Sequence, residues 1–151
     1  MQEITYKKIH SSFKLNGIHI TRDEMFYVAY CFIKEGKPFE QHIGTFLLDW
    51  FDEKPYIELT TSGSTGVPKV VRIDKQAMLD SALATGDFFG LEPGDTMLHC
   101  LPTNYVAGKM MWVRSFILGL EMKFVEPNSN PLDKIDETFD KSIDKSFDYN
   151  K

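Results

Sequence analysis

The chain has 151 residues, of which 42% are hydrophobic, so it is long enough for one globular domain with a buried core and is not a disordered chain. Its 17 basic and 22 acidic residues give a net charge of −5, which argues against a broad nucleic-acid-binding face. The N-terminus has no apolar signal-peptide region and Arg114 interrupts the longest apolar stretch, so we expect a cytoplasmic protein without a membrane span.

The first part of the chain predicts a hairpin followed by two helices. Asn16 and Gly17 both tolerate positive φ and lie in a stretch of alternating character, so they predict the turn of a β-hairpin. Thr21 can cap a helix that extends to about Glu35 and stops at the next glycine. Apolar residues recur with helical periodicity over residues 39–53, so this second helix is expected to bury one face.

The remainder of the chain predicts an alternation of strands and helices. The expected elements are strands at 56–61 and 70–73, a helix over 75–89, a strand at 96–100, a helix over 109–118 and a strand at 121–125. Asp74 can cap the first of these helices. The last three elements have the order and spacing of a βαβ unit, which implies parallel strands and a right-handed crossover. The predicted fold class is therefore α/β.

The segment between the first two of these strands, residues 60–69, is rich in small and hydroxyl-bearing residues. Gly63 and Gly66 admit backbone conformations closed to other residues and let an anion approach the main chain, where successive N–H groups form a nest for phosphate oxygens. Hydroxyl groups and the charge of Lys69 add further donors. A Walker loop is excluded because its spacing is absent and a strand follows the lysine. The segment predicts a polyphosphate site, and a generic glycine-rich turn is the alternative.

Residues 61–69, TSGSTGVPK, resemble the phosphate-loop signature of the adenylate-forming, or AMP-binding, enzymes, which include the acyl-CoA synthetases. The resemblance implies that ATP binds here with Mg²⁺ and that a carboxylate is activated as an acyl-adenylate and then passed to CoA. It also implies that Lys69 takes part in catalysis. The loop residues implied to contact the nucleotide are Thr61, Ser62, Gly63, Ser64, Thr65, Gly66 and Lys69.

Residues 101–118 resemble the loop and helix that line the acyl pocket in this family. Tyr105 occupies a position where many relatives have histidine, and it is expected to form pocket wall rather than to act as a catalyst, next to Gly108. Lys109 or Arg114 could face a second carboxylate of the substrate, but their separation of five positions allows at most one of them to point inward. The alternative for each is a solvated surface charge.

Within the family, residues 4–132 look most like the o-succinylbenzoate-CoA ligases of menaquinone biosynthesis, with a shortened N-terminal part. We therefore expect residues 1–132 to be the N-terminal part of an AMP-binding domain, with a mixed sheet flanked by helices. Residues 133–151 form a charged, repetitive tail, in which apolar residues recur every four positions at Phe139, Ile143 and Phe147. This tail predicts a marginal amphipathic helix or a frayed end, and a partner-docking helix is the alternative.

Motifs that follow this region in the family are not found in the chain, among them a magnesium-holding glutamate, a ribose-binding aspartate and the lysine of a C-terminal domain. We therefore expect an N-terminal fragment of a ligase, inactive alone, that self-associates or requires the remainder of the enzyme. A non-catalytic nucleotide-binding module is the first alternative, and a purely structural α/β domain is the second. Small-molecule ligands, a carboxylate and ATP, are the expected partners.

The cysteines and histidines give no sign of a disulfide or of a metal site. Cys31 and Cys100 lie in apolar surroundings without CxxC spacing, which predicts free, buried thiols. The four histidines have no metal-ligand spacing. No metal bound by protein side chains is therefore predicted.

Overall fold

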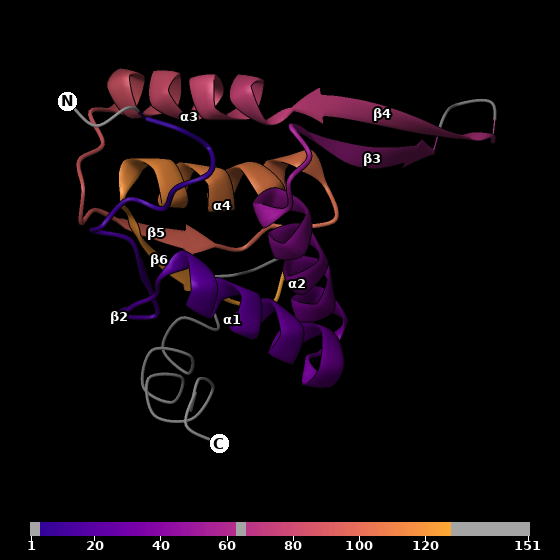
Figure 1. The fold of residues 1–151 in the computed structure, drawn as a ribbon, viewed down its shortest axis with the longest axis horizontal. Helices are drawn as coiled ribbons and strands as arrows, with labels where there is room; N and C mark the ends of the chain where they lie inside the picture. The colour runs from indigo at the N-terminus through magenta and orange to yellow at the C-terminus, as the bar shows by residue number, and fades with distance from the viewer. Residues whose placement is uncertain (1–3, 63–65, 128–151) are drawn as a thin grey trace.

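The computed structural model describes residues 4–62 and 66–127, apart from the side chains of residues 61 and 62, and Figure 1 shows its fold. The elements are β1 (Lys14–Leu15), β2 (Ile18–His19), α1 (Arg22–Glu35), α2 (Pro38–Phe51), β3 (Tyr56–Ser62), β4 (Pro68–Asp74), α3 (Lys75–Phe89), β5 (Thr96–His99), α4 (Val106–Leu118) and β6 (Glu121–Phe124). The tail predicted over residues 133–151, with its apolar stripe, lies outside the described residues.

Four strands form a mixed sheet in the order β2-β1-β6-β5. β1 and β2 pair in antiparallel fashion across the predicted turn, where Asn16 and Gly17 have φ values of 49° and 81°. β6 pairs in parallel with both β1 and β5, and α4 connects β5 to β6. The predicted α/β class, with a mixed sheet and a βαβ unit, is therefore confirmed.

The first two helices begin and pack as their sequences predict. Thr21 accepts a hydrogen bond from the Glu24 backbone N–H, and the Glu24 carboxylate accepts one from the Thr21 backbone N–H, which completes a capping box at the start of α1. α2 buries its periodic apolar face and packs against α1. Gly44 permits this close approach, because a Cβ there would lie 2.7 Å from the Ala29 carbonyl oxygen.

The core lies between the sheet and the helices. Figure 1 shows α3 lying along α4, with the sheet on the other side of α4. Trp112 of α4 is fully buried, and Phe116 of the same helix meets Phe13 edge-to-face with ring centroids 5.0 Å apart. Trp50 of α2 is also buried. No helix in the described ranges is long and apolar enough to cross a membrane.

Three local expectations differ from the structure. α4 begins at Val106 rather than at residue 109, because Gly108 belongs to the helix and packs against the preceding loop. Asp74 is the N-cap of α3, but its side chain makes no capping hydrogen bond. Cys31 and Cys100 are free but only half-buried, so the prediction of buried thiols is wrong.

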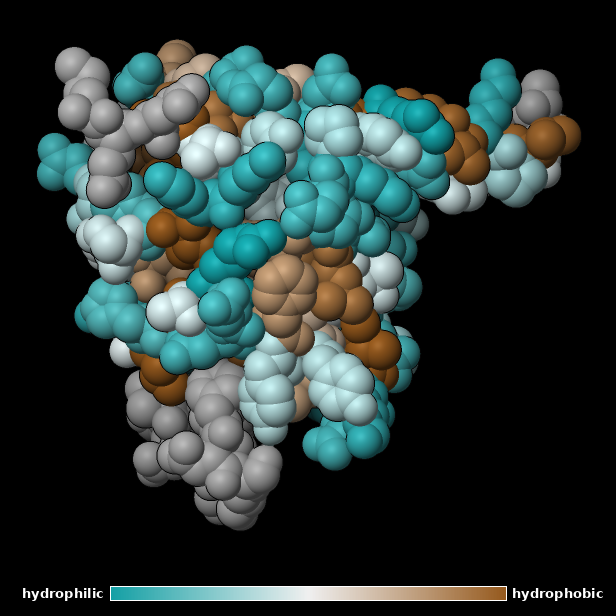
Figure 2. Space-filling view, viewed as in Figure 1, coloured by the Kyte–Doolittle hydropathy of each residue, from teal (hydrophilic) through white to brown (hydrophobic). Residues whose placement is uncertain are grey.

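β3 and β4 form a separate antiparallel hairpin that projects beyond the rest of the molecule in Figure 1. Ile57 and Leu59 are buried near its base, whereas almost all of β4 is exposed. In the described part of the chain these two strands pair only with each other. Figure 2 shows both hydrophobic and hydrophilic side chains along the projecting hairpin. The hairpin therefore depends on its base for its position.

Candidate functional site

The described ends of the predicted phosphate loop meet at the tip of the β3–β4 hairpin. The strand register places Thr61 opposite Lys69 and Ser62 opposite Pro68. Gly66 has φ +76°, and apart from its chain neighbours no atom of the described residues lies within 4 Å of the position that a Cβ would take there. Within the described part of the chain the backbone at Gly66 is thus unobstructed, and it has the left-handed conformation that favours a glycine. Gly63, Ser64 and Thr65 lie outside the described residues.

The base of the hairpin is closed by an ion pair between a buried lysine and a partly exposed aspartate. Lys75, the first residue of α3, has a side chain with no exposed surface, and its Nζ lies 2.8 Å from the Asp52 Oδ1. The same Nζ is 3.4 Å from the Asp52 carbonyl oxygen, and the Lys75 backbone N–H donates to the Pro55 carbonyl oxygen. The two chain segments that enter and leave the hairpin are thus joined at its base.

Asp52 accepts hydrogen bonds from both chain segments at the base of the hairpin. Its Oδ1 also accepts a hydrogen bond from the Lys54 backbone N–H at 2.8 Å. Partial burial acts to raise the pKa of the Asp52 carboxyl, but the hydrogen bonds from Lys75 and Lys54 outweigh that effect and hold the pKa below its ordinary value. This ion pair is not among the features predicted from the sequence. Its one signal is a lysine at the start of a helix, where the helix dipole disfavours positive charge.

The predicted acyl-pocket segment begins with an exposed tyrosine and a close-packed glycine. Tyr105 is the N-cap of α4 and is 65% exposed. At Gly108 a Cβ would lie 2.6 Å from the Pro102 carbonyl carbon and 2.9 Å from the Thr103 Cα. Only a glycine therefore lets the first turn of α4 lie this close to the loop that precedes it.

Lys109 is turned into the protein rather than into solvent. Lys109 is only 8% exposed. Its Nζ donates a hydrogen bond to the Thr103 carbonyl oxygen at 2.6 Å and lies 5.8 Å from the centre of the Phe46 ring. Burial lowers the pKa of Lys109, and the charge of Asp49 opposes that shift. The alternative of a solvated surface charge is thus excluded for this lysine. Arg114 is half-buried, and its Nε finds no hydrogen-bond partner in the described part of the chain.

His99 lies beside these residues, although the sequence analysis did not single it out. Its Nε2 is 3.1 Å from the Gly108 carbonyl oxygen and 3.2 Å from the Thr103 Oγ1, and its ring lies against Trp112. Burial lowers the pKa of His99 to about 4, so the ring is neutral at pH 7. Its position at the end of an apolar strand, just before the pocket loop, was the available signal.

The carboxylates at the end of α2 lie near both predicted binding segments. Burial, reinforced by the charge of Asp52, raises the pKa of Asp49, and Lys109 opposes the rise. The positive charge of Lys75 also acts to lower the pKa of the Asp49 carboxyl. The Asp49 carboxyl is therefore influenced by charges from the hairpin base and from α4, although within the described ranges it forms no ion pair with Lys109. The described residues include no cluster of three histidines, cysteines or acidic residues arranged for a metal ion.

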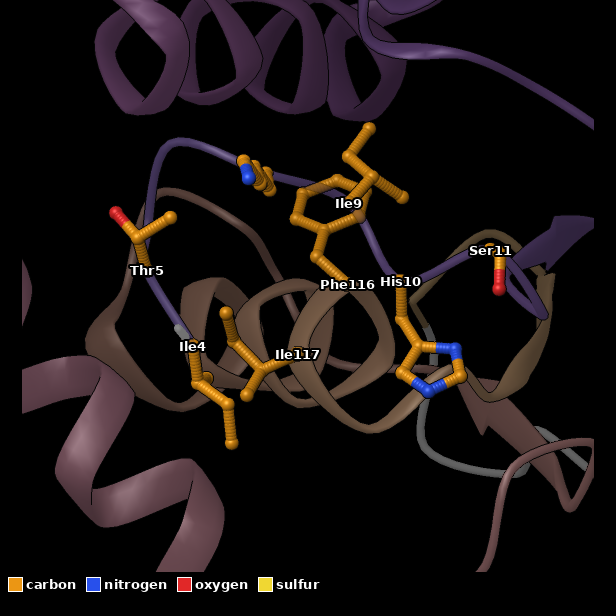
Figure 3. A pocket seen from close by; sticks show the side chains of 8 residues that line it. Ile4, Thr5, Ile9, His10, Ser11, Phe116 and Ile117 are labelled. Atoms are coloured by element: carbon orange, nitrogen blue, oxygen red, sulfur yellow. The ribbon is translucent and has the colours of Figure 1, made fainter. Parts of the chain in front are cut away.

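A separate cavity of about 350 Å³ lies under the N-terminal segment. Figure 3 shows this segment crossing α4, with its side chains and those of Phe116 and Ile117 lining the cavity. These two residues belong to the last turn of α4, whereas Tyr105 precedes the first turn. The cavity is therefore not part of either predicted site.

Comparisons with known proteins agree on the relationship of the chain. A family model described as AMP-binding enzyme matches residues 48–145, a range that includes the hairpin and α4. The 2-succinylbenzoate–CoA ligase of Haemophilus influenzae is 30% identical over 105 residues, which cover 68% of this chain and 23% of that protein. A crystal structure of an acyl-CoA synthetase (AMP-forming)/AMP-acid ligase II-like protein from Dyadobacter fermentans matches with a TM-score of 0.60 and 36% identity, over 68% of this chain and 29% of that one.

The chain thus spans less than a third of the length of each of these relatives. The family match extends over more than half of the residues. This chain therefore belongs to the AMP-binding enzyme family.

Proposed function

We propose that this chain supplies the nucleotide-phosphate site and part of the acyl pocket of an AMP-forming acid–CoA ligase. The observation that carries the proposal is the hairpin tip, where the two ends of the TSGSTGVPK segment are paired in register and the backbone at Gly66 is unobstructed within the described part of the chain. A nest of this kind suits phosphate oxygens, because backbone N–H groups can approach them without obstruction by side chains. The named relatives support ligase chemistry.

In this proposal the loop binds ATP through backbone N–H groups and hydroxyl groups, while Lys69 neutralises charge on the terminal phosphates. Each hydrogen bond to a charged oxygen contributes about 1.5–3 kcal/mol. Mg²⁺ would accompany the nucleotide, and it takes many of its ligands from phosphates and water rather than from a protein cage. The proposed residues are those predicted from the sequence: Thr61, Ser62, Gly63, Ser64, Thr65, Gly66 and Lys69.

The proposed acyl substrate is o-succinylbenzoate, supported by the resemblance to a 2-succinylbenzoate–CoA ligase over part of the chain. Tyr105 and Gly108 would form pocket wall. Lys109 and Arg114 are the two candidate cations. The Lys109 ammonium carries three donors and has the Thr103 carbonyl oxygen as its one hydrogen-bond partner among the described residues, while the Arg114 Nε has no partner there. The proposal includes CoA as co-substrate, a role in menaquinone biosynthesis, a cytoplasmic location, and association with the remaining parts of a ligase or with a second copy.

Calorimetric titration of the chain with ATP and Mg²⁺ tests the nucleotide site. We expect saturable binding that pyrophosphate competes away, and no binding would contradict the proposal. Titration of the ATP-loaded chain with o-succinylbenzoate then separates part of a ligase from a nucleotide-binding module. Binding of the dicarboxylate supports the ligase, whereas ATP binding with no dicarboxylate binding favours the module.

A further inference from the structure

We propose that the ion pair between the buried Lys75 and the partly exposed Asp52 fixes the direction in which the β3–β4 hairpin leaves the body of the protein. Lys75 and Asp52 are then positioning residues for the loop at the hairpin tip. The effect of the pair on the direction of the hairpin does not depend on any ligand, whereas its effect on ligand binding at the tip rests on the proposed function.

The pair lies where the chain enters and leaves the hairpin. Asp52 is the C-cap of α2, directly before the turn into β3, and Lys75 directly follows β4. The contact at 2.8 Å between Nζ and Oδ1 therefore ties the end of α2 to the start of α3. The bond from the Lys75 N–H to the Pro55 carbonyl oxygen, 2.9 Å long, adds a second tie across the base.

Other described contacts give the hairpin little directional support. Its strands pair only with each other in the described ranges, and an isolated two-stranded hairpin is at best marginally stable in water. Ile57 and Leu59 bury apolar surface at the base, but burial of apolar surface has no directional preference. A charge-assisted hydrogen bond has a defined distance and angle. The ion pair is thus the contact best suited to set an orientation.

The placement of Lys75 is hard to explain without this role. A positive charge in the first turn of a helix opposes the helix dipole, and complete burial of an ammonium group requires a partner. Removing Asp52 would therefore leave the buried ammonium of Lys75 without its charged partner. The exposed pair between Arg72 and Glu58, on the hairpin itself, lacks that constraint and provides a matched comparison.

Hydrogen exchange of the full chain tests the inference without any ligand. In Lys75→Met we expect the paired backbone amides of β3 and β4 to exchange about tenfold faster, while those of α1 keep their wild-type rates. Lys75→Arg should retain most of the protection because the charge remains. Glu58→Gln, which removes the exposed pair, should leave the hairpin rates unchanged. Unchanged rates in Lys75→Met, or equal acceleration in α1 and in the hairpin, would overturn the inference.

Pyrophosphate affinity provides the second readout. We expect Lys75→Met to bind pyrophosphate about tenfold more weakly than the wild type, and Glu58→Gln to bind it equally well. If Lys75→Met does not fold, Asp52→Ala replaces it in both measurements, because alanine removes both the charge and the side-chain acceptor of the Lys75 hydrogen bond. A wild-type chain that does not bind pyrophosphate contradicts the proposed function, and the exchange rates then decide the role of the pair by themselves.

Discussion

The His99 Nε2 lies 3.1 Å from the Gly108 carbonyl oxygen, so a buried imidazole joins the end of β5 to the first turns of α4. Thr103 shares the same nitrogen at 3.2 Å, and the Lys109 ammonium is bound to the carbonyl oxygen of Thr103. The loop between β5 and α4 is thus held from within by two side chains that the protein buries.

The first prediction concerns pH. The pKa of His99 is lowered from 6.5 to about 4 in the folded protein, so between these values the unfolded chain binds a proton that the folded chain does not. The free energy of unfolding should therefore fall as the pH decreases through this window, and between pH 7 and pH 5 the loss from His99 alone should be about 2 kcal/mol. Urea titrations at pH 7 and pH 5 measure the change. In His99→Gln the loss of stability should be smaller, because the contribution of His99 is absent, but not zero, because carboxylates that titrate in the same window remain. An equal loss in both proteins would contradict this account.

The second prediction concerns Lys69. Lys69→Ala should weaken ATP binding by about 1.5–3 kcal/mol and AMP binding by much less, because the proposed contact is with the terminal phosphates. Calorimetric titration with each nucleotide measures the difference. Arg72→Gln is the matched control, since Arg72 lies on the same strand and pairs with Glu58. Equal losses for ATP and AMP in Lys69→Ala would remove the assignment.

The third prediction concerns Gly108. Gly108→Ala should destabilise the protein by about 1–3 kcal/mol, because the new Cβ would meet the backbone of Pro102 and Thr103, which has little room to move. Gly86→Ala is the control. A Cβ at Gly86 would meet only the end of the Leu118 side chain, 2.7 Å away, and alanine is the better helix former. Chemical denaturation measures both variants, and a neutral Gly108→Ala would refute the close packing.

The fourth prediction concerns Lys109. If o-succinylbenzoate is the acyl substrate, Lys109→Met should weaken its binding more than that of benzoate, by about 2–5 kcal/mol for a desolvated charge pair. The ratio of the two affinities is the relevant measurement, because a general loss of stability affects both ligands. Arg114→Gln tests the other candidate cation in the same way. Identical effects of both variants on the two ligands would contradict a charge-based selection of the dicarboxylate.

The local features of this protein follow from neighbouring residues and could be predicted from the sequence. The Asn16–Gly17 turn, the Thr21–Glu24 capping box and the buried face of α2 each depend on residues a few positions apart. The TSGSTGVPK segment likewise carries its chemistry within a single stretch. The order of strands was not predictable in the same way, since β1 pairs with β6 from the far end of the described chain.

The surroundings of the charged side chains were decided only by the tertiary structure. Lys75 and Asp52 are 23 positions apart, and no local pattern marks Lys75 as buried or Asp52 as its partner. The same holds for His99, whose low pKa arises from burial beneath α4, and for Lys109, which is enclosed between Thr103 and the Phe46 ring of α2. Burial and desolvation are properties of packing between distant segments, so they change the energy of a charge without leaving a signal beside it in the sequence.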